Sequence, residues 1–197
     1  LPGSTPPTAT TSGGSGGGGA TTTPTATAPA TKPTLVGTNV WIRAVAAPNF
    51  HKYLQSSHPG QAGVAVLNDA STAGQFTVTN GALVLVGGAG AGANLYAVVN
   101  STVVGPGAGR LAVTFETKAN AYGAFKYSGD ALQWAVAGVT RPNESAWLVC
   151  GGQELFVNLG SYGYQTPEGC ADQTVSFFWG GSWKIGKHTS ELQSPPL

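Results

Sequence analysis

The feature that most constrains this chain is its pair of cysteines, the only two that it contains. Cys150 ends an apolar run, and Cys170 precedes a β-branched and aromatic run at residues 173–179. Another apolar run, at 155–159, follows Cys150 across the sequence GGQE at 151–154, which is typical of a short hairpin turn. These three runs predict three strands, and a bridge between the cysteines would join the first strand to the start of the third.

The cysteine pair has two interpretations. The cysteines are either two buried free thiols in a cytosolic protein or one structural disulfide in a secreted protein. We favour a disulfide between Cys150 and Cys170, because the chain also carries a linker-like N-terminal segment and glycosylation sequons. Closing a loop of roughly twenty residues in this way would contribute about 3 kcal/mol to stability.

The segment between the cysteines, GSYGYQTPEG, is too rich in glycine, proline and polar residues to be a strand, so we expect a loop. It carries Tyr162 and Tyr164, and Trp179 and Trp183 also lie in or beside glycine-rich sequence. Exposed rings of this kind can stack on the apolar faces of sugars, so all four are candidate carbohydrate-stacking residues. For the two tyrosines we favour the plainer alternative, in which both rings fold back over the disulfide as a small cluster.

The N-terminal segment, residues 1–34, consists almost entirely of Gly, Ser, Thr, Pro and Ala. It cannot bury enough apolar surface to offset its ordering entropy, so we expect a disordered linker. Alternating Thr and Pro favour an O-glycosylated tether over a tail without a role. We expect a folded domain at 35–180 and a loosely ordered tail at 181–197.

The expected domain contains about ten short strands separated by turn signals, with no helical periodicity. The clearest is a hairpin in which Asn80-Gly81 makes a type I′ turn between FTVT and ALVL. Trp134 and Trp147 lie in apolar runs and are expected in the core. Further strand candidates are 40–46, 50–55, 63–67, 95–99, 111–117, 124–127 and 132–136. The pattern predicts an all-β antiparallel fold, either a β-sandwich or a barrel-like sheet, with a β-trefoil as one option.

Two N-x-[ST] sequons, at Asn100 and Asn143, are expected at strand ends or in loops and are candidate N-glycosylation sites. Only 9% of residues are charged and the net charge is +1, without a basic cluster, which argues against nucleic acid as a partner. No apolar run approaches the length of a membrane span. The most economical account is a secreted, extracellular or wall-bound glycoprotein.

The chain offers no recognisable catalytic set, and we predict that it is not an enzyme and uses no metal or cofactor. The three histidines lack HxH or HExxH spacing, and no GxSxG sequence is present. Most acidic side chains fall in predicted turns, without a pair at the separation that glycoside hydrolysis needs. The acidic residues concerned are Asp69, Glu116, Asp130, Glu144, Glu154, Glu168 and Asp172.

The order of these features resembles fungal secreted cell-wall proteins of the phialide-development (PhiA) type, as a pattern over residues 39–178. The segments that carry the resemblance are IRAVAAPNFHKYLQS, FTVTNGALV, SGDALQW, WLVC, LFVNLG and GCADQTVSFF. The chain departs from the family's pattern in having only two cysteines and a long N-terminal linker. The resemblance implies an extracellular, glycosylated, non-catalytic wall protein, and it brings no catalytic residues to this chain.

Two functions are therefore expected to compete. The first is a structural or surface protein of the fungal wall or matrix, with wall polysaccharide or other wall proteins as partners. The second is a carbohydrate-binding accessory module, tethered by its linker to a glycan-degrading enzyme.

Overall fold

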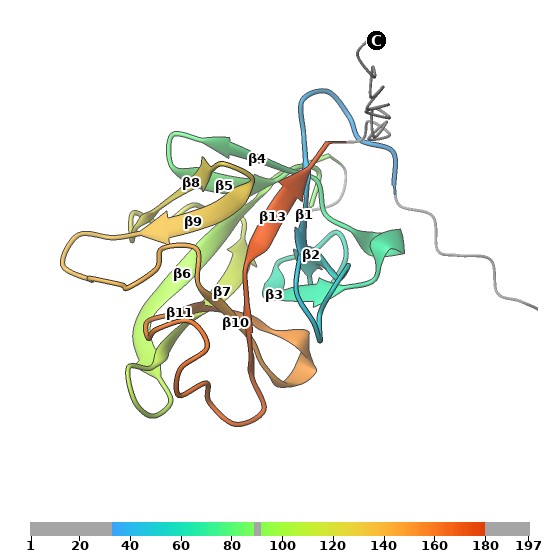
Figure 1. The fold of residues 1–197 in the computed structure, drawn as a ribbon. Coiled ribbons are helices and arrows are strands. Elements are labelled where there is room, and N and C mark those ends of the chain that lie inside the picture. Colours follow the sequence, from blue (N-terminus) through green and yellow to red (C-terminus); the bar gives the residue numbers. More distant parts are fainter. Residues whose placement is uncertain (1–32, 89–91, 180–197) are drawn as a thin grey trace, which may run out of the picture.

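The computed structural model describes residues 33–88 and 92–179, which form an all-β, antiparallel fold (Figure 1). Thirteen strands join into one sheet, and the described residues contain no α-helix, only two three-residue 3-10 turns. Of the expected linker, only 33 and 34 are among these residues, and the whole expected tail at 181–197 lies outside them.

The strands are short and follow one another along the whole described chain. They are β1 (Trp41–Ala44), β2 (Tyr53–Ser56), β3 (Gly63–Asn68), β4 (Phe76–Thr79), β5 (Ala82–Leu85), β6 (Leu95–Val104), β7 (Arg110–Glu116), β8 (Ala124–Ser128), β9 (Ala131–Ala135), β10 (Trp147–Val149), β11 (Leu155–Asn158), β12 (Ala171–Gln173) and β13 (Val175–Phe178). The 3-10 turns are Ala70–Thr72 and Gly151–Gln153.

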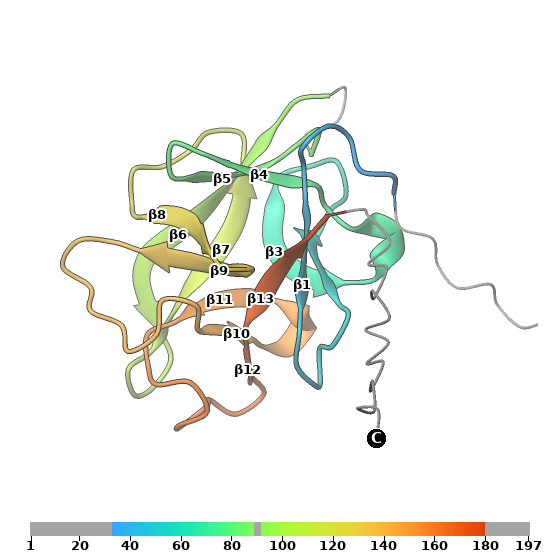
Figure 2. The same ribbon diagram turned by 45° about the horizontal axis from the view of Figure 1, so that its top comes forward.

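The sheet curls until it nearly closes, so the barrel-like form of the prediction is the one observed (Figure 2). Hydrogen-bonded neighbours run β4-β5-β6-β7-β3-β2-β1, and β13, β9 and β8 continue from β1. Val40, just before β1, exchanges two backbone hydrogen bonds of 2.9 and 2.8 Å with Phe76 at the start of β4. The amide of Phe125 in β8 donates to the carbonyl of Gly81 at 2.8 Å, which joins the end of this path to the β4–β5 turn.

The barrel interior is filled by side chains from alternate positions of the strands. In β7 the three inward residues Leu111, Val113 and Phe115 are buried, while the alternate residues are half-buried or, at Glu116, exposed. Trp134 and Trp147 are both fully buried, as predicted, and the Trp147 indole N–H donates to the carbonyl of Leu132 at 3.0 Å. One large apolar cluster therefore fills the interior, and a smaller one is formed by Trp41, Tyr53 and Ala73. We looked for a functional site on the outer faces and loops.

The predicted hairpin at Asn80-Gly81 is confirmed, since both residues have positive φ and the flanking strands pair in register. Two strand predictions were wrong in their bounds. The run 173–179 is not one strand: β12 pairs with β10, whereas β13 pairs with β1 and β9. The expected strand at 50–55 begins only at Tyr53, because the chain before it turns.

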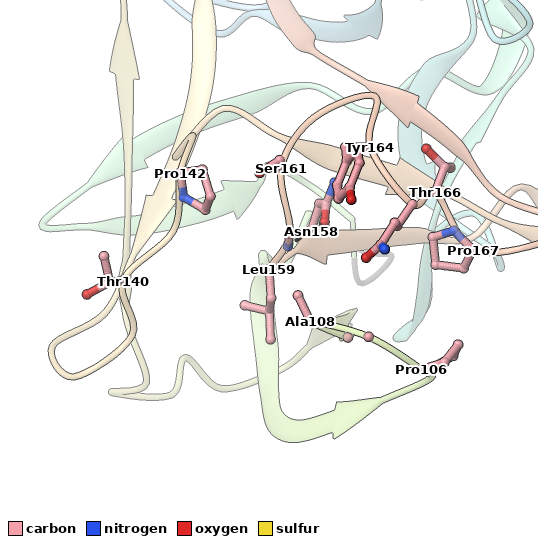
Figure 3. A pocket seen from close by; sticks show the side chains of 14 residues that line it. Pro106, Ala108, Thr140, Pro142, Asn158, Leu159, Ser161, Tyr164, Thr166 and Pro167 are labelled. Atoms are coloured by element: carbon pink, nitrogen blue, oxygen red, sulfur yellow. Dashed lines mark hydrogen bonds between the residues drawn. The ribbon is translucent and has the colours of Figure 1, made fainter.

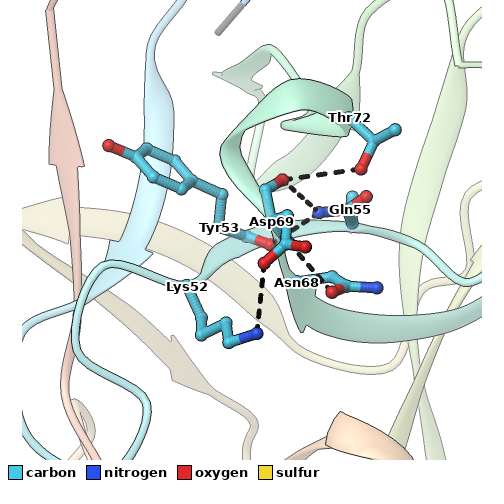
Figure 4. Close-up of polar contacts among 6 residues, drawn as sticks. All are labelled: Lys52, Tyr53, Gln55, Asn68, Asp69 and Thr72. Carbon is cyan, nitrogen blue, oxygen red and sulfur yellow. Dashed lines mark hydrogen bonds and ion pairs between the residues drawn. The ribbon is translucent and has the colours of Figure 1, made fainter. Parts of the chain in front are cut away.

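A polar cluster beside the Ala70–Thr72 turn holds β2 against the end of β3 (Figure 4). The side-chain amide of Gln55, which is 4% exposed, donates to the carbonyls of Tyr53 and Asp69, each at 3.2 Å. Lys52 pairs with the Asp69 carboxylate at 3.2 Å, and the Asp69 amide donates to the Asn68 side chain. Because these groups form their hydrogen bonds and ion pair with one another, we assign the cluster a structural role and do not treat it as a candidate site.

Candidate functional site

A pocket of about 350 Å³ lies where the loop between β11 and β12 meets the turn between β6 and β7 (Figure 3). Three separate parts of the chain form its wall. The lining residues are Pro106, Gly107, Ala108, Gly109, Thr140, Pro142, Asn158, Leu159, Gly160, Ser161, Tyr164, Gln165, Thr166 and Pro167. None of them is charged, so the wall offers hydroxyl, amide and backbone groups together with apolar surface.

The loop over this pocket is closed by the predicted disulfide. Cys150 and Cys170 are joined by an S–S bond of 2.04 Å, and the bond ties the end of β10 to the start of β12. Turn hydrogen bonds add to this: the Cys170 amide donates to the Pro167 carbonyl at 3.0 Å, and the Tyr164 amide donates to the Ser161 carbonyl at 3.2 Å. The pocket wall is therefore held by covalent and local restraints.

The inner wall is built around Asn158, the last residue of β11, which is only 6% exposed. Its side-chain oxygen accepts from the Gly160 amide at 2.8 Å, and its amide nitrogen donates to the Asp172 carboxylate at 2.9 Å. The Thr166 hydroxyl donates to the other oxygen of Asp172. Asp172 thus joins the strand beneath the pocket to the loop that covers it.

A buried arginine, Arg141, braces the segment that supplies Thr140 and Pro142. Its guanidinium donates to four backbone carbonyls, those of Asn158, Trp134, Glu144 and Ala146. Burial lowers the pKa of Arg141 to about 10, and the nearby carboxylate of Glu144 partly opposes that effect. All three nitrogens of the guanidinium are engaged by the protein itself, so we assign Arg141 to the scaffold of the pocket.

Tyr162 and Tyr164 do not fold back over the disulfide, and the expectation that they would was wrong. Tyr162 is 43% exposed and Tyr164 is 67% exposed, so neither ring is buried in a cluster over the disulfide. Tyr164 lines the pocket, whereas Tyr162 does not.

The four candidate stacking rings do not form one platform. Trp179 is 67% exposed but follows the far end of β13, away from the loop that carries Tyr162 and Tyr164 (Figure 1). There its ring lies 5.1 Å from that of Phe177, which in turn lies 4.6 Å from Tyr127. Trp183 lies outside the described residues.

Both candidate glycosylation sites are exposed and share one local geometry. The side-chain oxygen of Asn100 accepts from the Thr102 amide at 2.9 Å, and that of Asn143 accepts from the Ser145 amide at 2.8 Å. Asn100 was expected at a strand end or in a loop but lies inside β6, where the pairing with β7 shifts register. Asn143 directly follows Pro142 of the pocket wall.

The described residues offer little for acid–base or metal chemistry. No group of three or more His, Cys, Asp or Glu side chains among them could hold a metal ion. Ser57 and His58 lie 3.1 Å apart on an exposed loop, but no ion pair of the described chain joins His58 to a carboxylate. The arrangement at the pocket is suited to binding an uncharged molecule through hydrogen bonds and one aromatic ring.

Sequence reasoning identified Tyr164 but missed the rest of the pocket. The turn sequence GPGAG at 105–109 carries a signal for a tight loop, and three of its glycines have positive φ. Nothing in the sequence indicates that this turn meets the loop at 158–167, because the two are brought together only by the pairing of β7 with β11.

No family model matches the chain, and no curated protein or solved structure is detectably similar to it. The described chain contains no helix that is both long and apolar enough to cross a membrane. Fold and site define an all-β, disulfide-bonded, barrel-like domain with an uncharged pocket at one end.

Proposed function

We propose that this chain is a secreted, non-catalytic protein of the fungal cell wall or extracellular matrix. The observation that carries the proposal is the disulfide between Cys150 and Cys170, because such bonds form and persist in oxidising compartments. Exposed sequon asparagines at 100 and 143 support it, as glycans need an exposed acceptor. The wall assignment rests on the PhiA-type pattern of the sequence.

The pocket supports a non-catalytic role. Its lining residues include hydroxyls but no acid, histidine, cysteine or lysine, so no general base in the lining could activate a hydroxyl as a nucleophile. The carboxylate of Asp172, which contacts two of the lining residues, already accepts hydrogen bonds from Asn158 and Thr166.

Expression in a filamentous fungus, followed by fractionation, tests the proposal. We expect the protein in the wall or medium fraction, with a mass that falls on treatment with an N-glycanase, and with no uptake of alkylating reagent by the unreduced, denatured chain. The variants Asn100→Gln and Asn143→Gln should each remove one glycan. Retention in the cytosol with two free thiols would contradict the proposal.

A second candidate function, a carbohydrate-binding accessory module, is favoured by one observation: Tyr162, Tyr164 and Trp179 are all exposed. Large exposed rings are suited to stacking on sugar faces. Sedimentation with chitin, β-glucan and cellulose separates the two functions. A binding module is retained by at least one of these polysaccharides, whereas a purely structural wall protein stays in solution with all three.

A further inference from the structure

We infer that the pocket beside Tyr164 binds the end of a neutral saccharide chain, with one or two sugar rings held inside it. This inference rests on the second candidate function above and gives that function a site, a ligand class and a mode of binding. In this inference the exposed ring of Trp179 is not part of the saccharide site.

The volume of the pocket and the arrangement of its walls fit a small ligand. Its volume of about 350 Å³ lies at the small end of the range of about 300–1,000 Å³ that is typical of ligand sites. Its wall comes from the turn at 106–109, the segment at 140–142 and the loop at 158–167 (Figure 3). Enclosure by three segments favours the end of a chain over a stretch of polymer lying across a flat surface.

The polar groups of the wall match a sugar hydroxyl, which both donates and accepts hydrogen bonds. Asn158 uses one N–H on Asp172, and a side-chain amide has two, so one N–H remains for a ligand. Thr140, Ser161 and Gln165 add hydroxyl and amide groups that also act in both directions. The absence of a charged side chain from the lining favours a neutral sugar over an acidic one.

The ring of Tyr164 supplies the apolar contact that a sugar face needs. It lies at the rim, 67% exposed, on a loop held at its base by the disulfide and by the hydrogen bond from Thr166 to Asp172. Restraint before binding lowers the entropy lost on binding. By contrast, the ring of Trp179 lies beside that of Phe177, and Trp179 is not one of the residues that line this pocket.

Calorimetric titration of the purified protein, treated with endoglycosidase so that no glycan on Asn143 covers the rim, tests this inference. The probes are the hexasaccharides of chitin, β-1,3-glucan and cellulose, with oligogalacturonate as an anionic counterpart. Tyr164→Ala removes the ring, and Ala108→Phe fills the pocket while leaving the ring in place. Tyr162→Ala and Trp179→Ala are the matched controls, and circular dichroism verifies that all four variants are folded.

We expect at least one neutral hexasaccharide to bind, with an affinity that does not change between low and high salt. Tyr164→Ala should weaken this binding by about tenfold, Ala108→Phe should abolish it, and both controls should leave it unchanged. Stronger binding of oligogalacturonate than of every neutral probe would overturn the inference. If binding survives Ala108→Phe but is lost in Trp179→Ala, the inference that the pocket is the binding site is overturned, while the accessory-module function stands. If no probe binds, both the pocket inference and the accessory-module function are overturned.

Discussion

The side-chain amide of Asn158 donates to the carboxylate of Asp172 over 2.9 Å, and this bond joins the strand beneath the pocket to the strand after the disulfide. The same carboxylate accepts from the Thr166 hydroxyl. One partly buried carboxylate therefore fixes both the floor of the pocket and the loop above it.

Replacing Asp172 with alanine should destabilise the domain by about 1–3 kcal/mol, because the Asn158 amide is left buried without its acceptor. Urea denaturation measures this change. Glu168→Ala is the control, since Glu168 is an exposed carboxylate on the same loop, and its removal should change stability by less than about 0.5 kcal/mol. If Asp172→Ala lowered the free energy of unfolding no more than Glu168→Ala does, the contact between Asn158 and Asp172 would contribute nothing to stability.

Opening the disulfide in a Cys150→Ser/Cys170→Ser variant should cost roughly 3 kcal/mol, the chain entropy of a loop of this length. Hydrogen exchange should rise first in residues 159–169, the segment that the bond closes, and later in the core strand β7. A uniform rise along the chain would contradict this order.

Arg141→Lys should destabilise the domain by about 2–4 kcal/mol, because one ammonium cannot reach all four carbonyls that the guanidinium satisfies. Lys126→Ala is the control: it breaks the exposed ion pair with Glu144, 2.9 Å long, and should cost less than about 1 kcal/mol. Thermal unfolding of both variants compares the two effects. A loss below 1 kcal/mol in Arg141→Lys would contradict the scaffold role.

Local signals account for the parts of the fold that the sequence predicts well. The Asn80-Gly81 turn and the alternation beside it depend only on neighbouring residues, and the apolar setting of Trp134 is visible in its own strand. The break near Thr174 was missed because it reflects a change of partner strand, from β10 to β1 and β9. The pocket was missed for the same reason, since its three wall segments are distant in sequence.

Gly123 has a φ of +84° and lies against the ring of Trp134, so a Cβ there would collide with the indole. Gly123→Ala should destabilise the domain by the strain of a positive φ, about 1–2 kcal/mol, plus about 1–3 kcal/mol for the overpacked core. Gly129→Ala is the matched control, because Gly129 has a φ of +59° but open space around it. Similar losses in chemical denaturation would mean that the ring moves aside freely.

The phenol of Tyr127 is a buried hydroxyl with no hydrogen-bond partner among the described residues, and burial raises its pKa above the ordinary value. Tyr127→Phe removes that unsatisfied group, so its stability at neutral pH should equal or slightly exceed that of the wild type. Above about pH 10 an ordinary tyrosine loses its proton, and the folded wild type then binds more protons than the unfolded chain. The contribution of the Tyr127 phenol to the free energy of unfolding must therefore fall as the pH rises above about 10.

Urea denaturation of the wild type and of Tyr127→Phe, from pH 7 to above pH 10, separates the effect of the unsatisfied hydroxyl at neutral pH from the effect of its ionisation at alkaline pH. The wild type should lose stability relative to Tyr127→Phe only in the alkaline range, while the titration of all other tyrosines is shared by the two. A loss of more than about 1 kcal/mol in Tyr127→Phe at neutral pH would mean that the hydroxyl has a partner after all. Parallel curves in the alkaline range would mean that the phenol ionises as freely in the folded protein as in the unfolded chain.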